Sequence, residues 1–231
     1  MTNDPVDKGN GAQLVSIAVA DPPETWVAAG FTVVNGNEVR IGATTIVLEG
    51  RTNGDRGIVS WRLAGLDGPS TDDAGSLVDG LPTEFLELEP TPERAPAHPN
   101  GVIGLDHVVV ATPDLERTIH ALGQVGLTCR RIRETTSYGA PMRQAFFRIG
   151  ATVVEVVSGD RGSGQPAAEA PATWFGLAVD VDDLDQTGAF LGDGLGAVKA
   201  AVQAGRRIAT LRHKTFSMSI AVAAMDHHAD R

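Results

Sequence analysis

GLDHVVVATPDLERT, at residues 104–118, opens a pattern that RQAFFRIGATVVEVV, at residues 143–157, closes. Each stretch contains a run of branched apolar residues, which is typical of a buried strand. Each run also carries one side chain that can bind a metal, His107 in the first and Glu155 in the second. Because a buried imidazole or carboxylate is costly unless something pairs with it, these two residues are the first candidates for a functional site.

The chain between these two ends predicts one supersecondary unit. Thr112 can cap a helix, and Pro113 suits the first helical position. Alternating residues then predict three strands, at residues 128–135, 142–149 and 151–158. The predicted order is therefore strand, helix and three strands, with His107 in the first strand and Glu155 in the last.

The same pattern recurs on the C-terminal side. Residues 180–187, DVDDLDQT, overlay residues 111–118, ATPDLERT. Three further strands are predicted at residues 198–202, 207–212 and 218–224. In this register Gly176 takes the position of His107, and Val222 takes the position of Glu155.

A shorter copy of the pattern lies near the N-terminus, within residues 12–80. Its register places Ser16 where the central module has His107, and Val47 where it has Glu155. The central module is therefore the one in which both candidate residues occur.

The predicted domain organisation follows from composition. We expect a disordered tail at 1–11, a degenerate module at 12–80, a linker at 81–100, paired modules at 101–159 and 172–225, and a tail at 226–231. The linker is expected because five prolines fall within residues 81–100, and proline interrupts strands and helices. An unpaired degenerate module would leave a sheet edge open, which favours a homodimer.

Composition excludes several classes of protein. Of the 231 residues, 42% are hydrophobic and 21% charged, which is ordinary for a globular protein. The net charge of −10 argues against nonspecific nucleic-acid binding, which needs a basic surface. Cys129 is the only cysteine, so no intrachain disulfide can form. Because no apolar run has membrane-spanning length and the N-terminus lacks a signal-peptide pattern, we expect a cytoplasmic protein with neither membrane nor nucleic-acid partners.

The two quoted stretches and the order of elements resemble the vicinal oxygen chelate superfamily, which includes glyoxalases, bleomycin-resistance proteins and extradiol dioxygenases. The resemblance extends over residues 101–225 and, less closely, over residues 12–66. It implies an α+β fold of repeated βαβββ modules, paired so that their sheets curl into an open cup around a small molecule. In enzymes of the group it also implies a divalent metal, with lyase, isomerase or dioxygenase chemistry. Since the group also contains binding proteins without catalysis, the resemblance names no single reaction.

By this resemblance His107 and Glu155 are the predicted metal ligands and catalytic residues, with iron, nickel, zinc or manganese as the metal. Two ligands are an incomplete set, and a second copy in a homodimer would supply the same pair again. Without a metal, the two residues could act as an acid–base pair in a dry pocket, or hydrogen-bond a ligand. The structural alternative is a buried histidine bonded to a backbone carbonyl or to Glu155.

The other residues predicted to bind substrate are Arg143, Gln144, Phe146, Arg207, Trp174 and Tyr138. Arginines facing a cup, among them Arg206, would favour an anionic ligand such as a carboxylate. The alternative for each arginine is a solvated position at the edge of the sheet. Tyr138 lies in the loop TTSYGAPM, which either closes over a ligand or is an ordinary surface loop.

Two functional hypotheses follow from these residues. The first is a metalloenzyme acting on a small molecule with vicinal oxygens. The second is a metal-free protein that binds a small molecule, of the resistance or sequestration type.

Overall fold

The computed structural model describes residues 11–52, 54–68, 76–88, 94–136, 141–159 and 169–227. The chain divides into two compact units, each assembled from segments that are far apart in the sequence. The first unit comprises Met1–Val15, Ser60–Pro90 and Val108–Phe175, and the second comprises Ser16–Val59, Thr91–His107 and Gly176–Arg231. The predicted tails lie largely outside the described residues.

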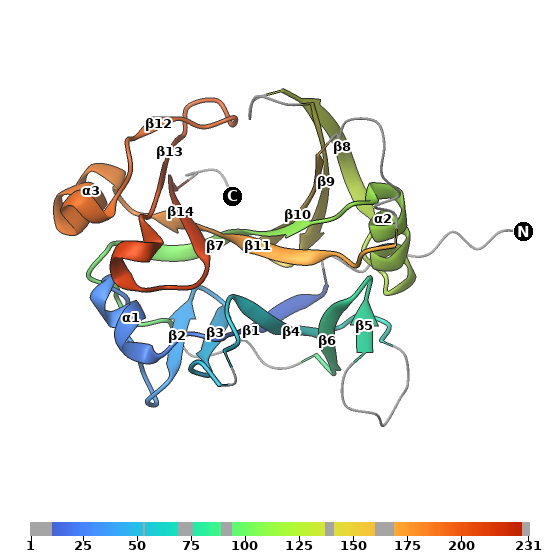
Figure 1. Ribbon diagram of the computed structural model, residues 1–231, viewed down its shortest axis with the longest axis horizontal. Helices are drawn as coiled ribbons and strands as arrows, with labels where there is room; N and C mark the ends of the chain where they lie inside the picture. Colours follow the sequence, from blue (N-terminus) through green and yellow to red (C-terminus); the bar gives the residue numbers. More distant parts are fainter. Residues whose placement is uncertain are drawn as a thin grey trace, which may run out of the picture. The chain divides into compact units, whose positions relative to one another are not determined.

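The elements follow one another along the chain in a repeated strand-rich pattern (Figure 1). In chain order they are β1 (Gln13–Val19), α1 (Pro23–Ala28), β2 (Glu38–Ile41), β3 (Thr44–Leu48), β4 (Ile58–Ala64), β5 (Ser76–Val78), β6 (Leu81–Leu86), β7 (Val102–Ala111), α2 (Leu115–Gln124), β8 (Cys129–Thr135), β9 (Met142–Ile149), β10 (Thr152–Gly159), β11 (Thr173–Val181), α3 (Leu184–Leu191), η1 (Gly192–Gly194), β12 (Lys199–Ala200), β13 (Arg207–Thr210), η2 (His213–Phe216) and β14 (Ala221–Asp226).

The strands form two sheets. One is six-stranded, in the order β2-β3-β1-β4-β6-β5, and the other is eight-stranded, in the order β12-β13-β14-β11-β7-β10-β9-β8. Within the second sheet, β7 to β10 and β11 to β14 repeat the same order of neighbours, and each set has a helix after its first strand. The predicted α+β class with repeated modules is therefore confirmed.

The N-terminal part of the chain differs from its prediction. The strands of residues 13–86 form two short sets, β1 to β3 and β4 to β6, and in each set the first strand runs parallel to the last. Ser76–Val78 forms strand β5.

The predicted linker at 81–100 is wrong over its first residues, because Leu81–Leu86 forms strand β6. Pro82 lies near the start of this strand, opposite Leu77 of the three-residue strand β5. A proline near the beginning of a strand removes one N–H donor and still lets the rest of the ladder form. The prolines of residues 81–100 therefore interrupt the chain less than the sequence predicts.

In the first unit, helix α2 covers one side of β9 and β10, which Figure 1 shows with β8 as a curved ribbon beside the helix. Leu115, Thr118 and Leu122 are the buried residues of α2, at the spacing of one helical face. The N-cap is Asp114, whose side chain accepts from the Arg117 N–H over 3.0 Å. The sequence had favoured Thr112 as the cap, and its hydroxyl instead bonds the backbone of Asp114.

In the second unit, helix α3 packs against β13 and β14. Asp183 caps it by accepting from the N–H groups of Asp185 and Gln186. Hydrogen bonds to these groups stabilise the carboxylate and hold the pKa of Asp183 below its ordinary value. No helix in the described part of the chain is long and apolar enough to cross a membrane.

Candidate functional site

Strands β8, β9 and β10 of the first unit present two different faces. Directly opposed residues of antiparallel strands point to the same side of the sheet. The pairs Ala145–Val156 and Phe147–Val154 are buried on the side that α2 covers. The other side, which we call the open face, carries Arg131, Arg133, Gln144, Phe146, Arg148, Val153, Glu155 and Val157.

Gln144 and Glu155 form the polar centre of the open face. Gln144 Nε2 donates to Glu155 Oε1 over 2.5 Å, and Gln144 is only 4% exposed. An ionised carboxylate can only accept hydrogen bonds, so the amide nitrogen faces it and the amide oxygen points elsewhere. That oxygen is buried and has no hydrogen-bond partner among the described residues. An unsatisfied buried acceptor costs about 1–3 kcal/mol, which a donor on a bound ligand would recover.

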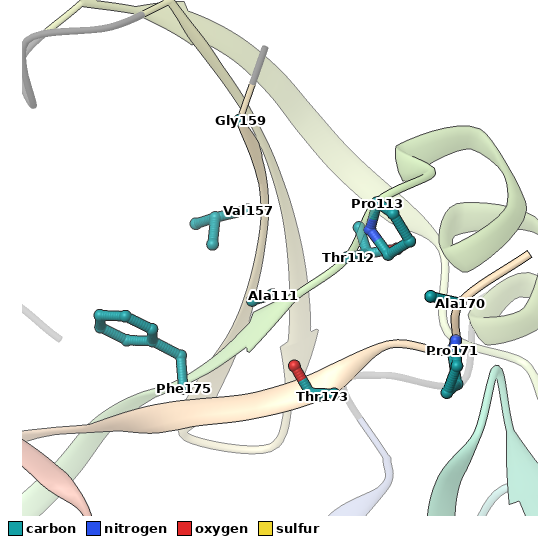
Figure 2. Close-up of a pocket in the computed structure, with 9 residues that line it drawn as sticks. All are labelled: Ala111, Thr112, Pro113, Val157, Gly159, Ala170, Pro171, Thr173 and Phe175. Carbon is teal, nitrogen blue, oxygen red and sulfur yellow. The ribbon is translucent and has the colours of Figure 1, made fainter. Parts of the chain in front are cut away.

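A cavity of about 290 Å³ borders the open face at Val157, the residue directly opposite Gln144. It is lined by Ala111, Thr112, Pro113, Val157, Gly159, Ala170, Pro171, Thr173 and Phe175. Figure 2 shows the Val157 and Phe175 side chains projecting from β10 and β11 into the space between these strands. The lining is mostly apolar, and the volume is near the lower end for small-molecule sites.

The wall of this cavity near α2 is fixed by a hydrogen-bond network. Arg117 donates to the Asp79 carboxylate over 2.6 Å and to the Ala170 carbonyl over 2.7 Å. Thr118 donates to Asp79 as well, and its hydroxyl lies 2.8 Å from that of Thr112. The cavity therefore has preformed walls, which lowers the entropic cost of binding a ligand.

Trp174, a predicted substrate-binding residue, is half-buried in the first unit. Its ring packs edge-on against Trp61, with centroids 4.8 Å apart, and its neighbours Thr173 and Phe175 are the cavity-lining residues of β11. Successive strand residues point to opposite faces, which places Trp174 on the other side of β11 from the cavity. Its buried Nε1 has no partner among the described residues.

Two of the predicted arginines are engaged away from the open face. Arg143 follows Met142 on β9 and pairs with Glu116 of α2 over 2.8 Å, on the helix-covered side. Arg207 pairs with Asp226 over 2.7 Å and with Asp185 over 2.9 Å. These hydrogen bonds raise the pKa of Arg207 and lower that of Asp226. Both side chains are therefore held in ion pairs, and a contact of Arg143 or Arg207 with a ligand stays a prediction.

The remaining predicted residues lie in different parts of the chain. Phe146 lies on the open face, directly opposite Glu155. Tyr138 lies outside the described residues. Glu155 belongs to the first unit and His107 to the second.

In the second unit, His107 is attached to a buried ion cluster that sequence reasoning missed. His107 Nδ1 lies 2.7 Å from Asp106 Oδ1. Arg206 donates to Asp106 over 2.9 Å and to Asp180 over 2.6 Å. Asp106, Asp180 and Arg206 are all less than 10% exposed. The sequence does carry a signal for this cluster: one aspartate lies in each of two mostly apolar strands, GLDHVVV and GLAVDV.

The described residues do not fit a resident metal. Among them, no group of three or more His, Cys, Asp and Glu side chains is arranged to hold an ion. In the third module, a Cβ added at Gly176 would lie 2.3 Å from the Ala221 carbonyl oxygen, so no histidine can replace it without a backbone shift. Val222, at the position equivalent to Glu155, is a buried apolar residue.

Two family models match this sequence. One, described as a glyoxalase-like domain, matches residues 4–126, and the other, described as the glyoxalase/bleomycin resistance protein/dioxygenase superfamily, matches residues 106–210. Together with the paired modules and open sheets, these matches define the class. The chain belongs to the glyoxalase-like domain family, within the vicinal oxygen chelate superfamily. A search of curated proteins finds no match.

A solved structure with the same fold aligns over most of this chain. A mutant of 4-hydroxymandelate synthase from Streptomyces coelicolor aligns over 95% of this chain and 93% of its own, with a TM-score of 0.60 and 14% identity. Methylmalonyl-CoA epimerase from Mycobacterium tuberculosis aligns over 55% of this chain and 90% of its own, with a TM-score of 0.44 and 21% identity. At 14% identity, the likeness to the synthase extends to the fold alone.

Proposed function

We propose that this protein binds a small organic molecule on the open face of the first unit, with Gln144 and Glu155 as polar anchors. The apolar part of the ligand occupies the cavity lined by Val157 and Phe175. The observation that carries the proposal is the buried Gln144 oxygen, which Glu155 holds in orientation and which no described residue satisfies. A polar group held in this way is costly unless it has a partner in the working state of the protein.

Glu155 is also the group best placed to act as a base on such a ligand. Its carboxylate lies on a partly buried face, next to the acceptor that would orient the ligand. A carboxylate at hydrogen-bonding distance from a bound molecule can accept a proton from it. Resistance by sequestration and catalysis share the binding step, and a turnover assay on an identified ligand separates them.

Chemistry at His107 is a second candidate, favoured by its bond to Asp106. A carboxylate on Nδ1 fixes the tautomer and orientation of an imidazole that works as an acid, a base or a metal ligand. A divalent metal at His107 is the form of this candidate that the family implies. It needs ligands from a second copy in a homodimer, because the described residues of one copy supply no set of three.

Elemental mass spectrometry of the untagged full chain tests the metal form of the second candidate. The control is His120→Ala, which changes an exposed histidine of helix α2. Stoichiometric iron, nickel, zinc or manganese that is lost in His107→Ala and retained in His120→Ala would support it. Sub-stoichiometric metal in all three proteins, also after incubation with these ions, would reject a metal at His107.

The main proposal is tested by screening chemically diverse small molecules for thermal stabilisation of the protein. Val157→Trp fills the cavity from the open face, and Glu155→Gln removes the charge that orients Gln144. Arg143→Gln is the matched control, because Arg143 lies on the opposite side of the same strands. Ligands should stabilise the wild type and Arg143→Gln, and should fail to stabilise Val157→Trp. Ligands that stabilise Val157→Trp and Glu155→Gln as strongly as the wild type would show that the site lies elsewhere.

A further inference from the structure

Three arginines share the open face with Gln144, and they identify the kind of ligand. Arg133 of β8 is directly opposite Gln144, Arg131 is opposite Phe146, and Arg148 lies two residues beyond Phe146 on β9. We infer that the ligand is an organic anion that also carries an O–H or N–H donor. This inference rests on the proposed function and names the chemical class of molecule that the open face takes.

The charge of the open face differs from that of the chain. Its described residues include three arginines and one glutamate, whereas the whole chain has a net charge of −10. Arg143 and Arg62, which lie elsewhere, are paired with Glu116 and Glu84. An excess of guanidinium groups on one face of an acidic protein attracts anions to that face.

The guanidinium groups of the open face remain available to a ligand. The Arg133 guanidinium donates to the neutral hydroxyl of Thr135 over 3.2 Å. Within the described part of the chain, no ion pair joins Arg131 or Arg148 to a carboxylate. Arginine binds carboxylate and phosphate through two parallel N–H donors, which gives strength and direction to such contacts.

The second requirement on the ligand comes from Gln144. Its oxygen is an acceptor that Glu155 fixes in place, so the ligand must present a hydrogen-bond donor there. Arg133 lies on the β8 side of Gln144 and Val157 on the β10 side. Since side chains of directly opposed residues lie about 5 Å apart, the donor is adjacent to the anionic group of the ligand.

The order of residues across the strands also orients the ligand. The anionic group lies toward β8, near Arg133, and the apolar group points toward Val157 and the cavity behind it. Glu155 is opposite Phe146 and two residues from Val157 along β10. Its Oε1 accepts the hydrogen bond from Gln144. A short hydroxy acid with a branched apolar chain meets all three requirements, whereas a bare hydrocarbon or a cation meets at most one.

The test uses three probes that differ by one group each. Hydroxyisocaproate has the anion, the donor and the apolar chain; isocaproate lacks the donor; the methyl ester of hydroxyisocaproate lacks the charge. Binding is measured by titration calorimetry at low and high salt. Hydroxyisocaproate should bind most tightly, and its affinity should fall with added salt, because screening weakens exposed charge interactions.

Paired variants assign the contacts. Arg133→Gln should lower the affinity for hydroxyisocaproate by about tenfold, the scale of one charge-assisted hydrogen bond. Arg148→Gln, farther from Gln144 along β9, should lower it by less, through the charge of the open face, and neither variant should affect the ester. Gln144→Leu should remove the preference for hydroxyisocaproate over isocaproate. Arg143→Gln, on the other side of the same strand as Arg148, should change neither.

Equal affinity for the acid and its ester, or an equal loss in Arg143→Gln and Arg148→Gln, would overturn the inference. The three probes could fail to bind while the diverse screen yields ligands whose binding depends on Val157. In that case the charge of those ligands decides whether the inference stands. Anions that need Arg133 or Arg148 support the inference, whereas neutral or cationic ligands overturn it and leave the proposed function standing. If no molecule binds in a Val157-dependent way, both are overturned.

Discussion

The open face of the first unit and the ion cluster of the second unit both bury polar groups, but they differ in how those groups are satisfied. In the cluster, Arg206 donates to Asp106, to Asp180 and to the carbonyl of Asp226. On the open face, the buried oxygen of Gln144 has no partner among the described residues. Burial of a polar group therefore does not by itself identify a binding site.

The physical difference lies in what each arrangement needs. One guanidinium and the two buried carboxylates around it satisfy one another's hydrogen bonds. The chief effect of the cluster is therefore on the stability of the fold. A fixed acceptor beside a cavity needs a donor from outside the protein, so its chief effect is on binding. Mutations in the two regions should separate an effect on stability from an effect on binding.

The largest effect is expected on removing the centre of the cluster. Arg206→Ala removes the guanidinium that donates to both buried carboxylates, Asp106 and Asp180, and should lower the free energy of unfolding by about 3–5 kcal/mol. Urea denaturation measures this loss. The control Arg207→Ala breaks exposed pairs, for which a loss below about 1 kcal/mol is expected.

If Arg206→Ala fails to fold, Arg206→Lys serves in its place, because lysine keeps the charge and loses the forked donors. A loss for either Arg206 variant no larger than that for Arg207→Ala would mean that the cluster is not a stabilising closed network.

A smaller effect is expected at Gly176, which shows why the third module carries no equivalent of His107. A Cβ at this position would lie 2.3 Å from the Ala221 carbonyl oxygen. Gly176→Ala should therefore destabilise the protein by about 1–3 kcal/mol, the usual range for overpacking. Gly123→Ala is the control, because a Cβ at Gly123 meets nothing within 4 Å and alanine favours helix α2. Equal unfolding free energies for the two variants would contradict this account.

The open face should respond to mutation in the opposite way to the cluster. Gln144→Leu removes the unsatisfied oxygen together with one hydrogen bond to Glu155. We expect its free energy of unfolding to stay within about 1 kcal/mol of the wild type, because the two effects oppose each other. A loss as large as that of Arg206→Ala would make Gln144 a structural residue and remove the contrast between the two regions.

The smallest effect is a pH dependence at His98, a second closed polar site in the second unit. Its Nδ1 accepts from the Thr32 N–H over 3.0 Å, and its Nε2 lies 2.9 Å from the Arg40 carbonyl oxygen. Burial lowers the pKa of His98 from its ordinary value of 6.5, and the bond to Arg40 opposes this shift. Protonation would also place a second donor against the Thr32 N–H.

Because the pKa of His98 is lower in the folded protein than in the unfolded chain, the unfolded chain binds more protons below that ordinary value. The stability contribution of His98 should therefore be complete above about pH 6.5 and decline as the pH falls toward the lowered folded value. Urea unfolding at two pH values, one on each side of that point, should show a smaller decline for His98→Gln than for the wild type. An equal decline would mean that other groups cause the pH dependence.

Local patterns in the sequence by themselves determined much of this protein. The apolar runs around His107 and Glu155 identify strands β7 and β10, and the spacing of Leu115, Thr118 and Leu122 identifies α2. These features depend on residues close together in the sequence, where the periods of helix and strand decide which side chains share a face. The α+β class and the repeated modules follow from that local information.

The tertiary structure alone decided which polar residues meet. Arg143 and Arg148 are the same residue type on one strand, and only the position of α2 makes the first a partner of Glu116 and leaves the second on the open face. Arg206 reaches Asp106 across 100 positions of sequence, a distance over which no local pattern carries information. Strand β6 likewise forms despite Pro82, because it gains hydrogen bonds from strands on both sides. Side-chain partners depend on strand register and helix packing, which are settled by burial of the whole core rather than by any one stretch of residues.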